Sequence, residues 1–257
     1  GYQWPWPRSY FAEIANQVNQ GDGKVIGVDI FLSEPDEDPA NDLAFAKALE
    51  NAPAAVGVVQ IFESPVDTFS ISTLLQAQPA YKNALDANGI TAFTRDEDAI
   101  VRSVQAYDIY KDKIYYHWAF EVARLYLDVE PPTQPTDTSI QFNGQAVPLR
   151  GKQVLVNFAG PSQTYTTYRA ADVHDGITLE ENPDAFRGKI VLIGATTVTL
   201  QDMYPTPFST QIPTAGVEIV ASTIDTLITG QYLTEAPPWV ALAMTIAAAL
   251  VAAFISR

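Results

Sequence analysis

Short apolar segments alternate with longer amphipathic stretches along most of the chain. The apolar segments carry hydrophobic residues on both faces, as strands buried in a sheet do; they are residues 25–30, 54–61, 153–158 and 189–194. The amphipathic stretches have apolar residues at helical spacing, which predicts helices at residues 9–20, from Pro39 onward, around residues 119–126 and at residues 216–230. This alternation predicts an α/β fold in which helices pack on a mostly parallel sheet.

Local signals add turns and helix ends to this outline. Asn143-Gly144 lies between two short alternating segments, and this dipeptide favours a two-residue hairpin. We therefore expect an antiparallel hairpin at one edge of the sheet. Ser9 is predicted to cap the first helix, and Asp38, directly before Pro39, is predicted to cap the second.

The C-terminal segment is uncharged from residue 239 to residue 255. This is close to the shortest run that spans a bilayer as a helix, for which about 20 residues are typical. Trp239 and Arg257 stand at its two ends, where interfacial residues are common. The pattern predicts a transmembrane helix over residues 237–257, the start of a longer membrane region, after an extracytoplasmic domain over residues 1–236. A buried core helix is the alternative, and we expect the chain to be a piece of a longer protein.

Small side chains recur at every fourth position of this segment. Such a stripe lets two membrane helices approach closely, so we expect it to pack against another helix. The alternative is that alanine is merely frequent here. The stripe consists of Ala241, Thr245, Ala249 and Ala253.

Charge and composition narrow the possible partners. The chain has 30 acidic and 15 basic residues and a net charge of -15, which argues against binding to nucleic acids or to anionic lipid surfaces. A hydrophobic fraction of 47% is enough for a large core. Cysteine is absent and only two histidines occur, so disulfides and thiolate nucleophiles are excluded, and we expect neither a metal nor a cofactor.

No motif for catalysis or nucleotide binding is present. The segment from Gly188 to Phe208 lacks both the Walker pattern and the dinucleotide-binding pattern of glycines. Ser162 does not stand in the Gly-x-Ser-x-Gly turn of a hydrolase nucleophile. His117, at a helix start, and His174, in a turn, are interpreted as surface residues. We therefore identify no catalytic residue.

Acidic residues form two candidate sites. The segment from Glu34 to Asp38, together with Asp42, lacks the register of a calcium-binding loop, so a solvated loop is the preferred interpretation.

The second candidate lies where strands are predicted to end. In open parallel sheets, ligands bind at the carboxyl ends of the strands. Side chains at this edge would form a pocket for a cation or an amine-bearing ligand. The alternatives are that Asp29 binds loop amides and that Glu218 only complements a helix dipole. The tentative ligand-binding residues are Asp29, Thr196, Asp202 and Glu218.

Several motifs together resemble a known family over nearly the whole chain, up to Leu233. They are WPRS (6–9), KVIGVDIFLSEPD (24–36), DEDAIVRSV (96–104), VLVNFAGPSQTY (154–165), ADVHDG (171–176), RGKIVLIGAT (187–196), DMYPTPF (202–208) and GVEIVASTIDTL (216–227). In this order they resemble the type-2 CHASE domain, an extracytoplasmic sensor attached to cyclases and histidine kinases. Val220 stands where the family often has His, and Ala99 where it often has Gly, so the first departure puts a ligand role for position 220 in doubt.

The resemblance implies a role in signalling. It implies one membrane helix before the domain, usually three after it, and a cytoplasmic output domain of the adenylate or guanylate cyclase or histidine kinase type. This chain would then be the non-catalytic input domain. We expect as partners an unidentified small-molecule or ion ligand, the membrane, and a second copy in a homodimer. The other hypotheses are a membrane-tethered hydrolase and a binding or scaffolding module without a signalling role.

Overall fold

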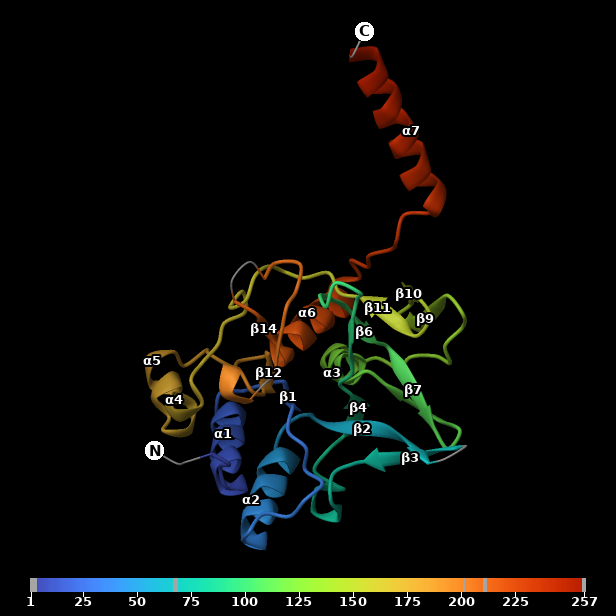
Figure 1. The fold of residues 1–257 in the computed structure, drawn as a ribbon. Coiled ribbons are helices and arrows are strands. Elements are labelled where there is room, and N and C mark those ends of the chain that lie inside the picture. The colour runs from blue at the N-terminus through green and yellow to red at the C-terminus, as the bar shows by residue number, and fades with distance from the viewer. Residues whose placement is uncertain (1–3, 67–68, 201, 210–211, 256–257) are drawn as a thin grey trace.

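The computed structural model describes residues 4–66, 69–200, 202–209 and 212–255 (Figure 1). Most of these residues form one body of helices and small sheets, and helix α7 (Pro238–Ile255) stands away from it. Within the described residues, the largest sheet has five strands in the order β12-β1-β2-β3, with β4 also paired to β2. The strands are β1 (Val25–Val28), β2 (Ala55–Val66), β3 (Phe69–Leu75), β4 (Ala87–Ile90) and β12 (Ile190–Ile193).

The pairing in this sheet is mixed. β1 lies parallel to β12 on one side and to β2 on the other, and the first half of β2 is also parallel to β4. The second half of β2 extends beyond β4 and pairs antiparallel with β3. The predicted strands at residues 25–30, 54–61 and 189–194 are thus β1, β2 and β12.

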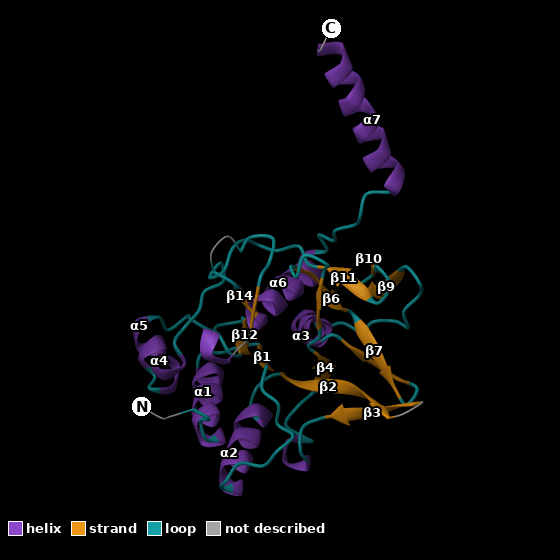
Figure 2. Cartoon of the chain, viewed as in Figure 1, coloured by secondary structure: helices purple, strands orange, loops and turns teal. Residues whose placement is uncertain are grey.

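The remaining sheets in the described residues are small and antiparallel (Figure 2). The prediction of a mostly parallel sheet is therefore wrong for the fold as a whole, which is mixed α/β. Residues 153–158 show the reason, since they supply β11, which pairs antiparallel with β6 instead of joining the main sheet. An apolar segment indicates burial but not which neighbour it pairs with. These strands are β5 (Phe93–Arg95), β6 (Val101–Gln105), β7 (Tyr107–Tyr110), β8 (Lys113–Tyr116), β9 (Ser139–Phe142), β10 (Gln145–Pro148), β11 (Gln153–Leu155), β13 (Met203–Tyr204) and β14 (Thr214–Ala215).

The hairpin at Asn143-Gly144 is confirmed as a turn but not as an edge of the main sheet. It joins β9 to β10, which form a two-stranded sheet of their own. Asn143 and Gly144 have φ angles of 48° and 72°, in the left-handed region that the primed hairpin turns require.

Helices cover both faces of the main sheet. α1 (Arg8–Gln20) packs against α2 (Pro39–Glu50) on one face, and α3 (Trp118–Leu127) packs against α6 (Gly216–Thr229) on the other. β1 contributes to both layers, since Ile26 and Val28 belong to the core under α1 and α2 while Val25 belongs to the core under α3 and α6. The short helices α4 (Ala170–His174) and α5 (Ile177–Glu181), with the 3-10 turns η1 (Pro79–Tyr81) and η2 (Val198–Leu200), lie in the connections.

The predicted helix caps have different outcomes. Asp38 caps α2 as expected, because its carboxylate accepts a hydrogen bond from the Ala40 amide at 3.0 Å. Ser9 does not cap α1, because the helix begins one residue earlier, at Arg8, after Pro7. A proline at that position offers no side-chain acceptor, and the first amide of α1, that of Arg8, instead donates to the Asp36 carboxylate at 2.6 Å.

The two histidines lie in different environments. His117 is fully buried at the start of α3, where its Nδ1 atom accepts a hydrogen bond from the Ala119 amide at 3.2 Å. Its interpretation as a surface residue is therefore wrong, and burial lowers its pKa from 6.5 to about 3. His174 is partly buried and stacks on the Tyr10 ring, with centroids 4.1 Å apart.

The expectation for the C-terminal segment requires a correction. It is helical, but no helix in the described residues is long and apolar enough to cross a membrane. The prediction of a transmembrane helix is wrong by this measure. α7 has 18 residues, which corresponds to a length of about 27 Å, whereas the hydrocarbon core of a bilayer is about 30 Å thick. Many of those residues are alanine, which adds little hydrophobicity.

Candidate functional site

Asp29 lies at the carboxyl end of β1, beside the end of β12. Its backbone amide donates a hydrogen bond to the Ile193 carbonyl at 2.8 Å, which continues the parallel pairing by one residue. The residue that follows β12 is Gly194. A Cβ atom at Gly194 would lie 3.3 Å from the Asp29 Cβ and 2.8 Å from the Val217 Cβ. The missing side chain therefore lets Asp29 approach the first turn of α6.

Asp202 reaches the same turn of α6 from the other direction. It directly precedes β13, and its backbone carbonyl accepts a hydrogen bond from the Gly216 amide at 3.0 Å. Its carboxylate rests on Gly216, where a Cβ atom would lie 2.5 Å from Oδ2. A glycine is thus needed at the first residue of α6 to make room for this carboxylate. The Tyr204 side chain donates a hydrogen bond to Asp202.

Burial raises the pKa of both carboxyl groups, and the charge of Asp202 adds to the rise at Asp29. Burial, followed by repulsion from Asp202, raises the pKa of Asp29 from 3.8 to about 7. Burial also raises the pKa of Asp202, against the opposing effect of the hydrogen bond from Tyr204. Burial and the neighbouring Asp202 raise the pKa of Tyr204 to about 12, so this hydroxyl keeps its proton at neutral pH. A pair of this kind favours a proton or a positively charged group between its members.

The other two predicted residues lie differently. Glu218, in the first turn of α6, accepts hydrogen bonds from the Thr164 amide at 3.0 Å and from the Ser162 hydroxyl at 3.4 Å, so its carboxylate anchors the loop before α4. Thr196 is exposed in the loop after β12. The structure therefore couples Asp29 to Asp202, and it gives Glu218 a structural contact. A ligand role for all four residues stays a prediction.

The acidic segment after β1 is more ordered than a solvated loop. Asp36 accepts hydrogen bonds from the Arg8 amide at 2.6 Å and from the Asn41 side chain at 2.9 Å. Asp42 is only 2% exposed and accepts hydrogen bonds from the Asp36 amide and the Tyr81 hydroxyl, both at 2.8 Å. These acids hold the connection between β1 and α2.

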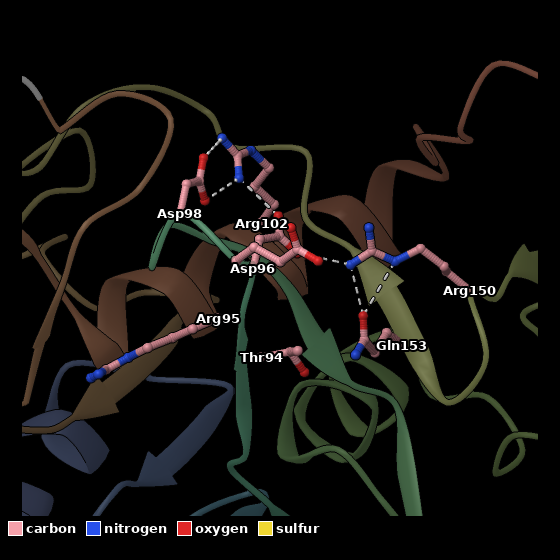
Figure 3. Close-up of a pocket in the computed structure, with 8 residues that line it drawn as sticks. Thr94, Arg95, Asp96, Asp98, Arg102, Arg150 and Gln153 are labelled. Atoms are coloured by element: carbon pink, nitrogen blue, oxygen red, sulfur yellow. Dashed lines mark hydrogen bonds and ion pairs between the residues drawn. The ribbon is translucent and has the colours of Figure 1, made fainter. Parts of the chain in front are cut away.

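A separate pocket of about 640 Å³ lies between the β5–β6 turn and the start of β11 (Figure 3). Arg102 binds Asp98 and Asp96, each at 2.8 Å, and Arg150 binds the other oxygen of Asp96 at 3.1 Å. The hydrogen bond from Arg102, opposed by burial and assisted by Arg150, lowers the pKa of Asp96 below its usual value. Figure 3 shows Arg95 pointing away from this network. Its guanidinium lies 5.3 Å from the centre of the Tyr204 ring, the side chain that donates a hydrogen bond to Asp202.

This pocket was not predicted from the sequence. Residues 96–104 stand out there only as part of a family motif, and nothing in the sequence links them to Arg150. A local signal was present, because Asp98 and Arg102 carry opposite charges within one short turn.

Helices enclose a mixed sheet, and the Asp29 and Asp202 carboxylates lie at the strand ends against the start of α6. The class of the domain comes from the comparison with protein families, in which the CHASE2 domain model matches residues 2–255. The chain belongs to the CHASE2 domain family, which comprises extracytoplasmic sensor domains of cyclases and kinases. Comparisons with curated proteins and with solved structures find no match.

Proposed function

We propose that the chain is the input domain of a membrane signalling protein of the cyclase or histidine kinase type. In this proposal it senses a small positively charged ligand, an amine-bearing molecule or an ion, through Asp29 and Asp202. The conformational change that follows ligand binding is passed to a cytoplasmic output domain, and the chain itself catalyses no reaction. Family membership supports the sensor role. The observation that carries the ligand class is the carboxylate pair held against Gly194 and Gly216.

The energetics of the pair favour a responsive site. Keeping two neighbouring carboxylates ionised where water reaches them only in part destabilises the unliganded domain at neutral pH. A ligand with a positive charge removes this repulsion and so binds preferentially to the folded state, which it stabilises by mass action. Ligand binding and the stability of this edge of the sheet are therefore linked.

The position of the pair suggests how its state is passed on. Asp202 contacts Gly216, the first residue of α6, and the last residue of α6, Thr229, leads through residues 230–237 to α7. A change in charge at Asp202 therefore acts on the start of the helix that connects the sheet to the C-terminal segment.

For α7 we propose contact with another helix, of the same or a second protomer, through the stripe of small side chains. Thr245 fits such a face, because its hydroxyl donates to the Ala241 carbonyl at 2.9 Å within the helix. Its polar group is thus satisfied before any partner arrives. In a homodimer, the stripe would join the two copies.

A ligand screen tests the ligand class. Small amines and inorganic cations are screened by thermal shift against the wild-type chain, Asp202→Asn and the matched control Glu130→Gln, which alters an exposed acid. Compounds that use the pair stabilise the wild type and the control but not Asp202→Asn. Equal stabilisation of all three chains by every hit would overturn the assignment of the ligand to this pair.

In the full-length protein, Asp202→Asn should change signalling output more than it changes thermal stability. The reason is that asparagine mimics a protonated or charge-neutralised Asp202 while conserving its shape. Unaltered output, measured as product formation by the output domain, would remove the pair from the signalling path.

A further inference from the structure

Arg150 joins the pocket to the segment that leads out of the domain. It lies in the turn between β10 and β11. Its Nη2 atom donates to Asp96 Oδ1 at 3.1 Å, inside the pocket, and its Nη1 atom donates to Glu235 Oε1 at 2.7 Å. Glu235 belongs to residues 230–237, which connect α6 to α7. A single guanidinium group therefore links the pocket to this connection.

The pocket side of Arg150 is firmly held. Nη2 also donates to Gln153 Oε1 at 2.8 Å and reaches the Ser103 hydroxyl at 3.4 Å, and Figure 3 shows Asp96 and Gln153 on the same side of the guanidinium. Arg102 braces Asp96 from its other side at 2.8 Å. The position of Arg150 therefore does not depend on Glu235.

The ion pair that Glu235 forms with Arg150 is easily replaced by another carboxylate. The Glu235 side chain is 57% exposed, and an exposed ion pair contributes little stability because water and salt compete for both charges. The geometry nevertheless shows that a carboxylate fits at Nη1. In this structure that carboxylate is supplied by the chain itself.

The charges around the pocket favour a ligand that replaces Glu235 over one that binds beside it. Among the described residues, the pocket lining has as many arginines as acids, but Arg95 points away toward Tyr204, so acids outnumber the remaining arginines even before Glu235 is counted. An external carboxylate that bound beside Glu235 would meet net repulsion, whereas one that takes the place of Glu235 leaves the local charge unchanged. The charged lining residues are Arg95, Arg102 and Arg150 against Asp96, Glu97 and Asp98.

We propose that the pocket is a binding site for a small molecule with a carboxylate group, which competes with Glu235 for Arg150 and thereby releases the connection to α7. Glu235 is the built-in occupant that keeps the connection against the body in the absence of ligand. The beginning of the connection stays attached in both states, because Asn157 donates to the Gln231 carbonyl at 3.2 Å and Tyr232 packs on the core. Release is therefore confined to residues 233–237. The site is distinct from the Asp29–Asp202 pair and does not depend on the ligand of that pair.

The absence of cysteine gives a direct way to measure release. Nitroxide labels are attached to cysteines introduced at two exposed positions, Ala236→Cys in the connection and Glu180→Cys on α5. Double electron–electron resonance spectroscopy then gives the distribution of distances between the two labels. Glu235→Gln should broaden the distribution and raise the ratio of released to tethered molecules roughly two- to five-fold, the range expected for an exposed ion pair. Glu130→Gln, the matched control, should leave it unchanged.

Acetate then serves as the carboxylate probe, with chloride at equal ionic strength as its reference. Acetate should broaden the wild-type distribution toward that of Glu235→Gln, and chloride should not. Arg150→Gln should be broad from the start and insensitive to acetate. Because Glu235 is exposed, Glu235→Gln keeps the fold. This variant alone therefore tests whether Glu235 holds the connection against the body. An unchanged distribution in Glu235→Gln, or the same effect of acetate and chloride on the wild type, would overturn the proposal.

Discussion

Replacing Asp29 with asparagine should stabilise the domain at neutral pH. Asparagine has the shape of a protonated aspartic acid but cannot ionise, so it removes the cost of burying a charge and, in addition, the repulsion from Asp202. The rise in the pKa of Asp29 from 3.8 to about 7 corresponds to an upper limit of about 4 kcal/mol in the free energy of unfolding. Asp29 is only partly buried, so solvent screening reduces this limit. We expect Asp29→Asn to raise the free energy of unfolding by about 1–3 kcal/mol at pH 8.

The pH dependence shows at which pH the titration of Asp29 lowers the free energy of unfolding. Between pH 3.8 and about 7, folded Asp29 holds a proton that the unfolded chain has released. The stability contributed by this proton is complete below the unfolded pKa and is lost as the pH rises through the folded pKa. The advantage of Asp29→Asn over the wild type should therefore be small below about pH 4, grow from there up to about pH 7 and stay constant above it.

Urea denaturation of both chains, followed by circular dichroism from pH 5 to pH 8, measures this difference. Other groups titrate in the same range, but they titrate in both chains and cancel in the difference. An exposed substitution, Glu130→Gln, is the control and should give a difference independent of pH. A difference between Asp29→Asn and the wild type that is flat, or that favours the wild type at pH 8, would refute the account of the pair.

The remaining predictions test the room left by a glycine, the buried histidine and the stripe of α7. Gly216→Ala places a Cβ atom 2.5 Å from the Asp202 carboxylate, so it should cost about 1–3 kcal/mol of stability, and clearly less in an Asp202→Ala background; equal costs in both backgrounds would argue against the contact. The pKa of His117 is lowered from 6.5 to about 3, so its neutral form stabilises the fold fully above pH 6.5 and this contribution is lost as the pH falls toward 3. His117→Asn, compared with the wild type by urea denaturation, should therefore show a penalty that is about 2 kcal/mol smaller at pH 5 than at pH 7.5, and a penalty independent of pH would contradict burial of a neutral histidine. In the full-length protein, Ala249→Leu should disturb signalling output more than Ala248→Leu, which lies about 100° around the helix; equal small effects would mean that the stripe reflects composition alone.

The main sheet was predictable where its strands are apolar on both faces and short. β1 and β12 were found at the right residues, because such segments are buried whatever they pair with. The same signal misplaced β11, because pairing partners depend on contacts between residues far apart in the chain. β11 pairs with β6, about fifty residues earlier, as the register Gln153 to Gln105 shows. The pattern along the chain carries no information on that choice.

The burial of His117 also escaped prediction, for a related reason. The sequence placed it correctly at the start of a helix, where polar residues are usually solvated. Its surroundings are made by β4, to which it bridges at Ile90, and by Phe93, whose ring lies 6.5 Å away. A helix start that is covered by a strand from another part of the chain looks the same in sequence as an exposed one.

The two candidate sites also differ in how far local sequence rules could predict them, and this difference determines how each is best tested. Asp29 and Asp202 follow neighbouring parallel strands, so the rule that ligands bind at strand ends was enough to place them together from the amino-acid sequence alone. The role of Gly194 and Gly216 in this approach was not predicted, because a glycine at a strand end or a helix start does not show which side chain it makes room for. Arg150, in contrast, is 54 residues from Asp96 and 85 residues from Glu235. No local rule connects residues at these separations, and each ion pair alone is weak. Their significance comes from sharing one guanidinium group, so the informative experiment removes Glu235 and leaves Arg150 in place: only then is the connection to α7 freed while the pocket stays intact.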